Sequence, residues 1–182
     1  MMSFLKHLSD QITFKAFFVS LLLMTLFMGI VLPHEASNYA LMTNNAQAPD
    51  THLFYTSSWL YELAQTLGNE GRNFYVISRL RFDIAWPIVY GSFLITCISL
   101  FVPFKHKHKL LLFPLFSVLF DLLENTLVSI FFLAYPTKLT FIGVMAGFMT
   151  LFKWVTLSFS FLLIMIGLLH LTIKKIKIRR TL

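Results

Sequence analysis

The stretch LLLFPLFSVLFDLLENTLVSIFFLA, residues Leu110 to Ala134, is long and apolar, yet Asp121, Glu124 and Asn125 interrupt it near its middle. Positions three and four residues apart fall on one face of a helix. An unpaired charge in lipid costs at least about 2.5 kcal/mol, and such charges are retained mainly where they face protein or a cavity. The stretch therefore predicts a membrane-spanning helix whose polar face turns toward the protein interior.

The composition of the whole chain agrees with a membrane protein. Of the 182 residues, 57% are hydrophobic and only 13% are charged, and the mean hydropathy is +0.75. A soluble domain carries roughly twice that charged fraction. The net charge of +7 comes from basic residues that cluster beside apolar segments, which is typical of membrane topology and not of nucleic-acid binding. The single cysteine, Cys97, excludes an internal disulfide.

Four apolar segments approach or exceed the roughly 20 residues that a bilayer-spanning helix needs. We therefore expect one all-α integral membrane domain, residues 1–182, with four transmembrane helices in a bundle. The expected spans are about 16–33, 84–104, 110–134 and 141–173.

Basic residues predict the orientation of these spans. Lys6 and Lys15 precede the first span, Lys105 to Lys109 separates the second and third, and a basic run from Lys174 follows the fourth. With four spans, all three groups fall on one side, and the positive-inside rule assigns that side to the cytoplasm. We expect a multi-pass protein of a bacterial inner (plasma) membrane, with both termini cytoplasmic.

The external loop between spans one and two, about residues 34–83, is predicted to contain a helix. Apolar and aromatic side chains recur at helical spacing between His52 and Leu67. Such a stripe is typical of a helix lying at the membrane interface. Gly68 can end this helix, and a second helix then leads from about Gly71 into span two.

Lys153, deep in the fourth span, is the expected counter-ion of the acidic face. At 1.5 Å per residue, Asp121 lies roughly 16 Å from the cytoplasmic end of its span, and Lys153 roughly 18 Å from the outer end of the next. These depths place Lys153 level with Asp121 or Glu124. Gly143 and Gly147 form a GxxxG spacing, which permits close helix approach.

Span two contributes further candidate site residues: Arg79, Asp83, Trp86 and Tyr90. Arg79 and Asp83 form an i, i+4 pair, which fits either a solvated salt bridge at the helix end or part of a polar site. Trp86 and Tyr90 fit either interface anchors or the lining of a cavity. The alternatives remain open at this point.

Other chemistries lack their motifs. The six histidines include no i, i+4 pair and no HExxH spacing, so we expect no metal. The sequence has neither a glycine-rich phosphate loop nor a GxSxG motif, and we expect no cofactor.

Two sequence blocks, DIAWPIVYG at residues 83–91 and DLLEN at residues 121–125, resemble a family of small bacterial four-span membrane proteins. The resemblance covers about residues 68–125 and implies the four-span fold but no activity. A looser similarity to the EXPERA group, which includes sterol isomerases, rests on four spans and intramembrane acids only.

Three functions fit the sequence. In the first, the protein binds or moves a lipid-like or amphipathic small molecule or a proton, in a pocket between spans two, three and four. Asp121, Glu124, Asn125 and Lys153 would then form its polar cluster. In the second, a buried carboxylate is the general acid or base of a lipid-modifying enzyme. In the third, the polar cluster only holds together a structural, accessory or immunity-type subunit. The lipid bilayer is the expected partner, and the sequence leaves the oligomeric state open.

Overall fold

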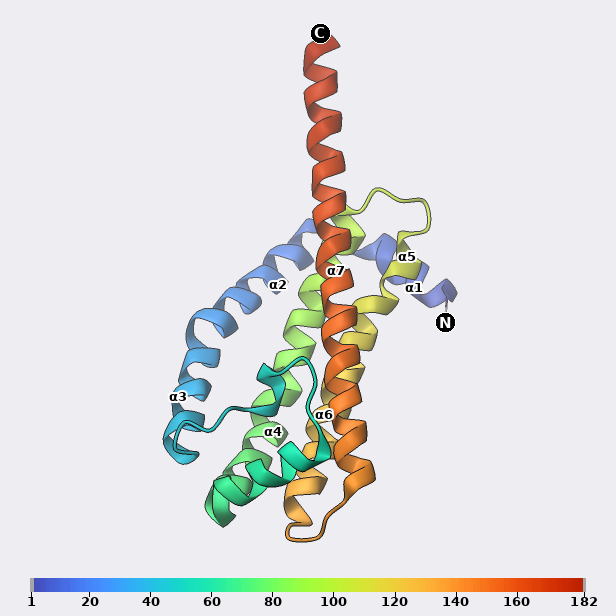
Figure 1. The fold of residues 1–182 in the computed structure, drawn as a ribbon. Coiled ribbons are helices and arrows are strands. Elements are labelled where there is room, and N and C mark those ends of the chain that lie inside the picture. The colour runs from blue at the N-terminus through green and yellow to red at the C-terminus, as the bar shows by residue number, and fades with distance from the viewer. Residues whose placement is uncertain (1, 182) are drawn as a thin grey trace.

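The computed structural model describes the backbone of residues 2–181 and the side chains of residues 2–178. Within this range the chain forms helices and connecting turns, without strands (Figure 1). The elements are α1 (Met2–Gln11), α2 (Phe14–Leu26), a π-helical turn (Phe27–Val31), α3 (Leu32–Met42), a 3₁₀ turn (Pro49–Thr51), α4 (Ser57–Phe101), α5 (Lys107–Leu110), α6 (Leu112–Leu133) and α7 (Thr140–Thr181).

Four helical segments among the described residues are long and apolar enough to cross a membrane, as predicted. They are Phe14–Met42, Ser57–Phe101, Lys107–Leu133 and Thr140–Ile178. This pattern is typical of a multi-pass membrane protein. The link between the second and third of these segments, residues 102–106, comes three residues earlier in the chain than the predicted Lys105 to Lys109.

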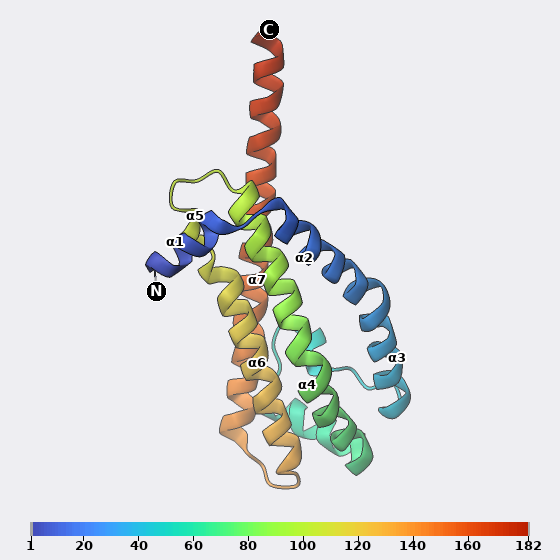
Figure 2. The same ribbon diagram turned by 180° about the vertical axis from the view of Figure 1, so that it is seen from behind.

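Helices α4, α6 and α7 form the core of the bundle, and α2 lies along one side of α4 (Figures 1 and 2). The contact between α2 and α4 is partly aromatic, since the rings of Phe17 and Phe93 stack with centroids 6.2 Å apart. The hydroxyls of Ser20 and Thr96 share a hydrogen bond of 2.9 Å. Toward α3 the first segment diverges from α4, which leaves room between them for other residues.

The apolar run predicts that the first segment ends at Pro33. In the structure the helix continues through this proline. It continues to Met42, and π-helical hydrogen bonding over Phe27–Val31 ends two residues before the proline. Proline lacks a backbone N–H, and its ring collides with the carbonyl four residues earlier in a regular α-helix. The wider π turn accommodates that ring, so the helix passes the proline without ending.

The loop that follows, residues 43–56, replaces the first part of the predicted external helix. Asn44 and Asn45 turn the chain with positive φ angles of 51° and 61°, a conformation that asparagine tolerates. Helix α4 begins at Ser57 and not at His52, because the Thr56 hydroxyl caps it by accepting a hydrogen bond from the Trp59 amide.

The first part of α4 ends at Gly68, whose φ of 61° and ψ of −173° interrupt the helix as predicted. The leucine stripe before this break is buried, with Leu60, Leu63 and Leu67 in the same apolar cluster as Phe131 of α6. The stripe therefore faces the protein. Its location at the membrane surface stays a prediction.

Helix α7 extends well past the other helices at one end of the molecule (Figure 1). Its 42 residues measure about 63 Å at 1.5 Å per residue, more than the hydrocarbon core of a bilayer requires. The same end carries α1 and α5, which pack against each other. The three basic groups of the sequence thus gather at one end of the bundle.

A layer of buried polar side chains lies between two apolar clusters. One cluster contains Tyr75, Val128 and Ala146, and the other contains Tyr90, Leu111 and Ile164. Along each core helix the buried charges fall between these positions: Arg79 and Asp83 on α4, Asp121 and Glu124 on α6, Lys153 on α7. The apolar clusters close the polar layer from both ends.

We predict that Gly68→Ala lowers the free energy of unfolding by about 1–3 kcal/mol, because essentially only glycine occupies these backbone angles. An added Cβ at Gly68 meets no atom of the described residues within 4 Å, so the change in stability reports on the backbone conformation and not on a steric clash. Unfolding by SDS in mixed micelles measures it. Gly29→Ala is the matched control, since its Cβ also meets no atom within 4 Å and its φ is not positive. Equal stability of the two variants would contradict the prediction.

Candidate functional site

Lys153 of α7 pairs with both carboxylates of α6. Its Nζ lies 2.6 Å from Glu124 Oε2 and 3.5 Å from Asp121 Oδ1. All three side chains are buried, and Glu124 is 0% exposed. The spacing along α6 puts both carboxylates on the face that meets α7. One lysine therefore serves two acids, which leaves the group one negative charge in excess if all three are ionised.

Asp121 has two further partners. The Tyr90 hydroxyl of α4 donates to Asp121 Oδ2 at 2.9 Å and also approaches the Ser117 carbonyl at 3.2 Å. The Asn125 amide donates to Asp121 Oδ1 at 3.3 Å, whereas Asn125 Oδ1 has no hydrogen-bond partner within residues 2–178. Asp121 thus joins α4, α6 and α7 at one point.

Glu124 is reached by a residue that the sequence did not single out for this site. The Tyr55 hydroxyl, from the 43–56 loop, donates to Glu124 Oε1 at 3.3 Å. A Cβ added at Gly147 would collide with the Tyr55 carbonyl, and one at Gly143 would lie 2.6 Å from the Ser57 hydroxyl. The two glycines of the GxxxG spacing therefore leave space on α7 for the backbone at Tyr55 and for Ser57. They are also compatible with close approach of a neighbouring helix.

A second polar group surrounds Arg79 of α4. Its Nη1 lies 3.1 Å from Asp50 Oδ2 and also contacts Asp83 Oδ2. Arg79 and Asp83 are 8% and 4% exposed, so their pair is not the solvated one that the sequence left open. The guanidinium lies 4.4 Å from the Tyr75 ring centroid, within the range of a cation–π contact.

Asp50 connects the two polar groups electrostatically. Burial on its own would raise the pKa of Asp50, but the positive charges of Arg79 and Lys153 outweigh burial and hold that pKa below its ordinary value of 3.8. No sequence pattern indicates this role, because a lone acid in an irregular loop belongs to no periodic face.

A cavity of about 500 Å³ lies beside the second group, between α3, the 43–56 loop and α4. Three of the predicted site residues line it: Arg79, Asp83 and Trp86. The Trp86 ring stacks against Phe27, with centroids 6.1 Å apart, and it also contacts Tyr90 edge-on at 5.5 Å. Trp86 therefore lies between the cavity and the Tyr90–Asp121 contact.

The structure brings the eight predicted residues together as two groups and not as one. Lys153, Asp121, Glu124, Asn125 and Tyr90 form the first, while Arg79, Asp83 and Trp86 belong to the second. We expected a pocket between spans two, three and four. The cavity beside Arg79 lies on the α3 side of α4. A smaller pocket of about 170 Å³ does lie between α4, α6 and α7, at Ser57, Phe131 and Thr140, but none of the eight predicted residues lines it.

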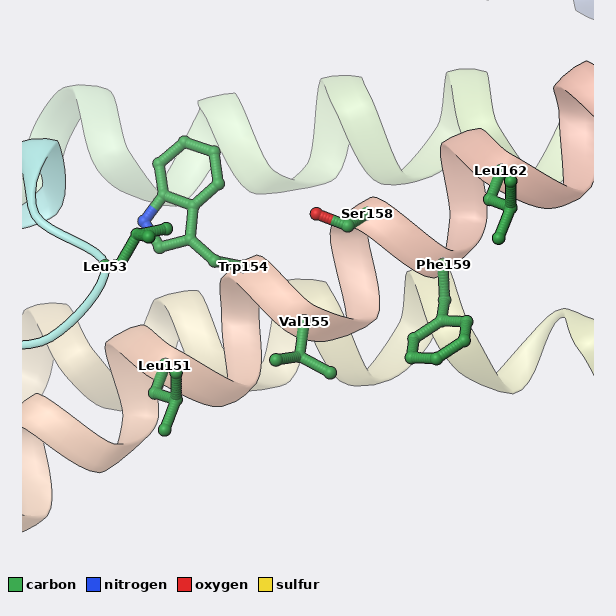
Figure 3. Close-up of a pocket in the computed structure, with 7 residues that line it drawn as sticks. All are labelled: Leu53, Leu151, Trp154, Val155, Ser158, Phe159 and Leu162. Atoms are coloured by element: carbon green, nitrogen blue, oxygen red, sulfur yellow. The ribbon is translucent and has the colours of Figure 1, made fainter.

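A smaller groove of about 330 Å³ runs along α7, lined by Leu53, Leu151, Trp154, Val155, Ser158, Phe159 and Leu162 (Figure 3). Its lining is almost entirely apolar. Figure 3 shows Leu53, from the 43–56 loop, beside Trp154 at one part of the groove. The same loop thus borders the groove as well as the polar cavity.

The polar groups can hold charge, protons and hydrogen bonds. Within residues 2–178, no three histidine, cysteine, aspartate or glutamate side chains lie close enough to hold a metal ion. Comparisons with protein-family models, with curated proteins and with solved structures found no match. The similarity to a bacterial four-span family therefore rests on its two sequence blocks alone.

We predict that Lys153→Met destabilises the protein by about 3–5 kcal/mol, because Asp121 and Glu124 lose their buried counter-ion. The triple variant Lys153→Met, Asp121→Asn, Glu124→Gln removes all three charges and should regain most of this loss. SDS unfolding of both variants in mixed micelles gives the comparison. A single variant as stable as the wild type would show that the ion pair does not hold α6 and α7 together.

We also predict a pH-dependent contribution from Asp50. Because its folded-state pKa is lowered, its ionised form stabilises the protein fully above about 3.8 and loses this effect as the pH falls through the lower folded value. Asp50→Asn should therefore melt below the wild type at neutral pH, and the difference should shrink on acidification. Asp10→Asn, which changes an exposed carboxylate of α1, is the control. A difference that stays constant down to low pH would contradict this assignment.

Proposed function

We propose that this protein binds a lipid-like or amphipathic small molecule in the cavity between α3, the 43–56 loop and α4. The observation that supports this proposal best is the lining: three candidate site residues of the sequence, Arg79, Asp83 and Trp86, border one cavity of about 500 Å³. Ligand sites typically measure about 300–1,000 Å³ and combine apolar walls with a few polar groups. Leu32, Ala36 and Phe82 supply apolar wall here.

The ion-paired group around Lys153 has a supporting role in this proposal. Residues 43–56 contact both sites, since Asp50 binds Arg79 at the cavity and Tyr55 binds Glu124 in the bundle. A ligand that displaces Asp50 would act on Lys153 through this loop. The surplus carboxylate beside Lys153 is a place where a proton can be held or released, so movement of the ligand or of a proton fits the same arrangement.

The direction of the chain in the membrane belongs to the same proposal. Basic residues gather at the end that carries α1, α5 and the last turns of α7, and the positive-inside rule assigns this end to the cytoplasm. Both termini would then lie on the cytoplasmic side of a bacterial plasma membrane, and the cavity would open toward the outer leaflet.

The proposal predicts that a lipid-like molecule co-purifies with the protein and depends on Trp86. We expect mass spectrometry of the protein, purified in nanodiscs of defined lipid, to show an enriched molecule that is lost from Trp86→Leu. Trp154→Leu makes the same exchange in the apolar groove of α7 and should retain the molecule.

Two results would oppose this prediction. Loss from Trp154→Leu with retention in Trp86→Leu would assign binding to the groove on α7. No enriched molecule in any sample, together with a wild-type melting temperature for the charge-free triple variant, would favour the structural role of the polar cluster. Chemical conversion of an added lipid by the purified protein would instead favour an enzyme.

A further inference from the structure

We infer that the ligand of this cavity carries an ammonium group and, next to it, a hydrogen-bond acceptor oxygen. This inference rests on the binding function proposed above and names the chemical class of the molecule. Three features of the lining support it: the balance of charges, an unpartnered donor on Arg79, and aromatic walls.

The cavity lining has more acid than base. Glu35 of α3, Asp50 of the loop and Asp83 of α4 face one cation, Arg79. Arg79 already contacts two of these carboxylates through the same nitrogen, Nη1. The third carboxylate, that of Glu35, is half-buried and accepts a hydrogen bond of 3.5 Å from the Ser78 hydroxyl. A cation entering the cavity would therefore find a carboxylate that Arg79 does not neutralise.

Arg79 supplies an independent indication of a ligand. The residue is more than nine-tenths buried, and it lines the cavity. Its Nε–H has no hydrogen-bond partner among the residues that the structure describes. A buried donor without a partner is unfavourable and is usually satisfied by another group. Because the carboxylates of Asp50 and Asp83 already neutralise the guanidinium, a neutral oxygen suits Nε better than a third anion would.

The remaining walls suit the rest of such a molecule. Tyr39, Phe82 and Trp86 place aromatic rings around the cavity, and ring faces attract ammonium groups. Leu32 and Ala36 continue an apolar wall along α3, where an alkyl chain can lie. Long-chain amino alcohols combine these features, whereas fatty acids and alkyl phosphates would meet the surplus carboxylates.

The test compares probes that share one alkyl chain and differ in the head group. The full-length protein in phosphatidylcholine nanodiscs is titrated with a vicinal amino alcohol bearing a dodecyl chain, with the corresponding diol, and with the corresponding hydroxy acid. Saturable binding is measured by calorimetry against empty nanodiscs. We expect the amino alcohol to bind roughly tenfold or more tightly than the diol, since a hydrogen bond to a charged group is worth that much. The hydroxy acid should bind weakest.

Variants identify the groups responsible. Glu35→Gln should remove the preference for the amine over the diol, and Glu70→Gln, at an exposed position of α4, should keep it. Dodecylamine, which lacks the oxygen, should bind more weakly than the amino alcohol because Nε of Arg79 stays unpartnered. Melting curves of both variants establish that each is folded.

The outcomes separate the two proposals. Equal or tighter binding of the diol or the hydroxy acid would overturn the ammonium assignment and leave the binding function standing. An unchanged preference in Glu35→Gln would also overturn it. Equal binding of dodecylamine and the amino alcohol would overturn the role of Nε. Absence of saturable binding by every probe, together with no co-purifying molecule, would remove the binding function itself.

Discussion

Lys153 lies 2.6 Å from Glu124 and 3.5 Å from Asp121, inside a bundle whose outward-facing residues are mostly apolar. Charges are costly in hydrocarbon, so this contact restricts how α6 and α7 can be rotated: both carboxylates and the lysine must face inward together. It also restricts their relative height, because a shift of one residue moves a side chain by 1.5 Å along the axis and turns it by a large angle. Tyr90 brings α4 to the same layer through Asp121.

Residues 43–56 complete this arrangement although they form little regular structure. Tyr55 reaches Glu124 because Gly143 and Gly147 leave no side chain in its path. Five residues earlier in the chain, Asp50 pairs with Arg79 of α4 at the cavity. The loop therefore depends on the charges of three core helices, and those charges depend on the loop for part of their hydrogen bonding. Ordering of the loop and of the polar layer should be coupled.

The cavity lies where the first membrane-length segment separates from α4. Near α1 the two helices are held by Phe17, Ser20 and their partners, whereas α3 diverges from α4. The polar residues that line this space are therefore adjacent to a helix with few core contacts. A molecule bound there would meet Arg79 and Asp50 directly and would reach the ion pairs of α6 and α7 only through residues 43–56.

The sequence alone predicted the four membrane-length helices, the break at Gly68 and the inward polar face of α6, because hydropathy and helical periodicity are local properties. Depth along the helices also placed Lys153 level with the acids of α6. Only the tertiary structure identified Asp50 and Tyr55 as partners of the buried charges, since a loop has no periodicity from which its direction can be predicted. The cavity on the α3 side of α4 was likewise decided by packing between segments distant in sequence, whereas the first helix continues past Pro33 through the local π turn at Phe27–Val31.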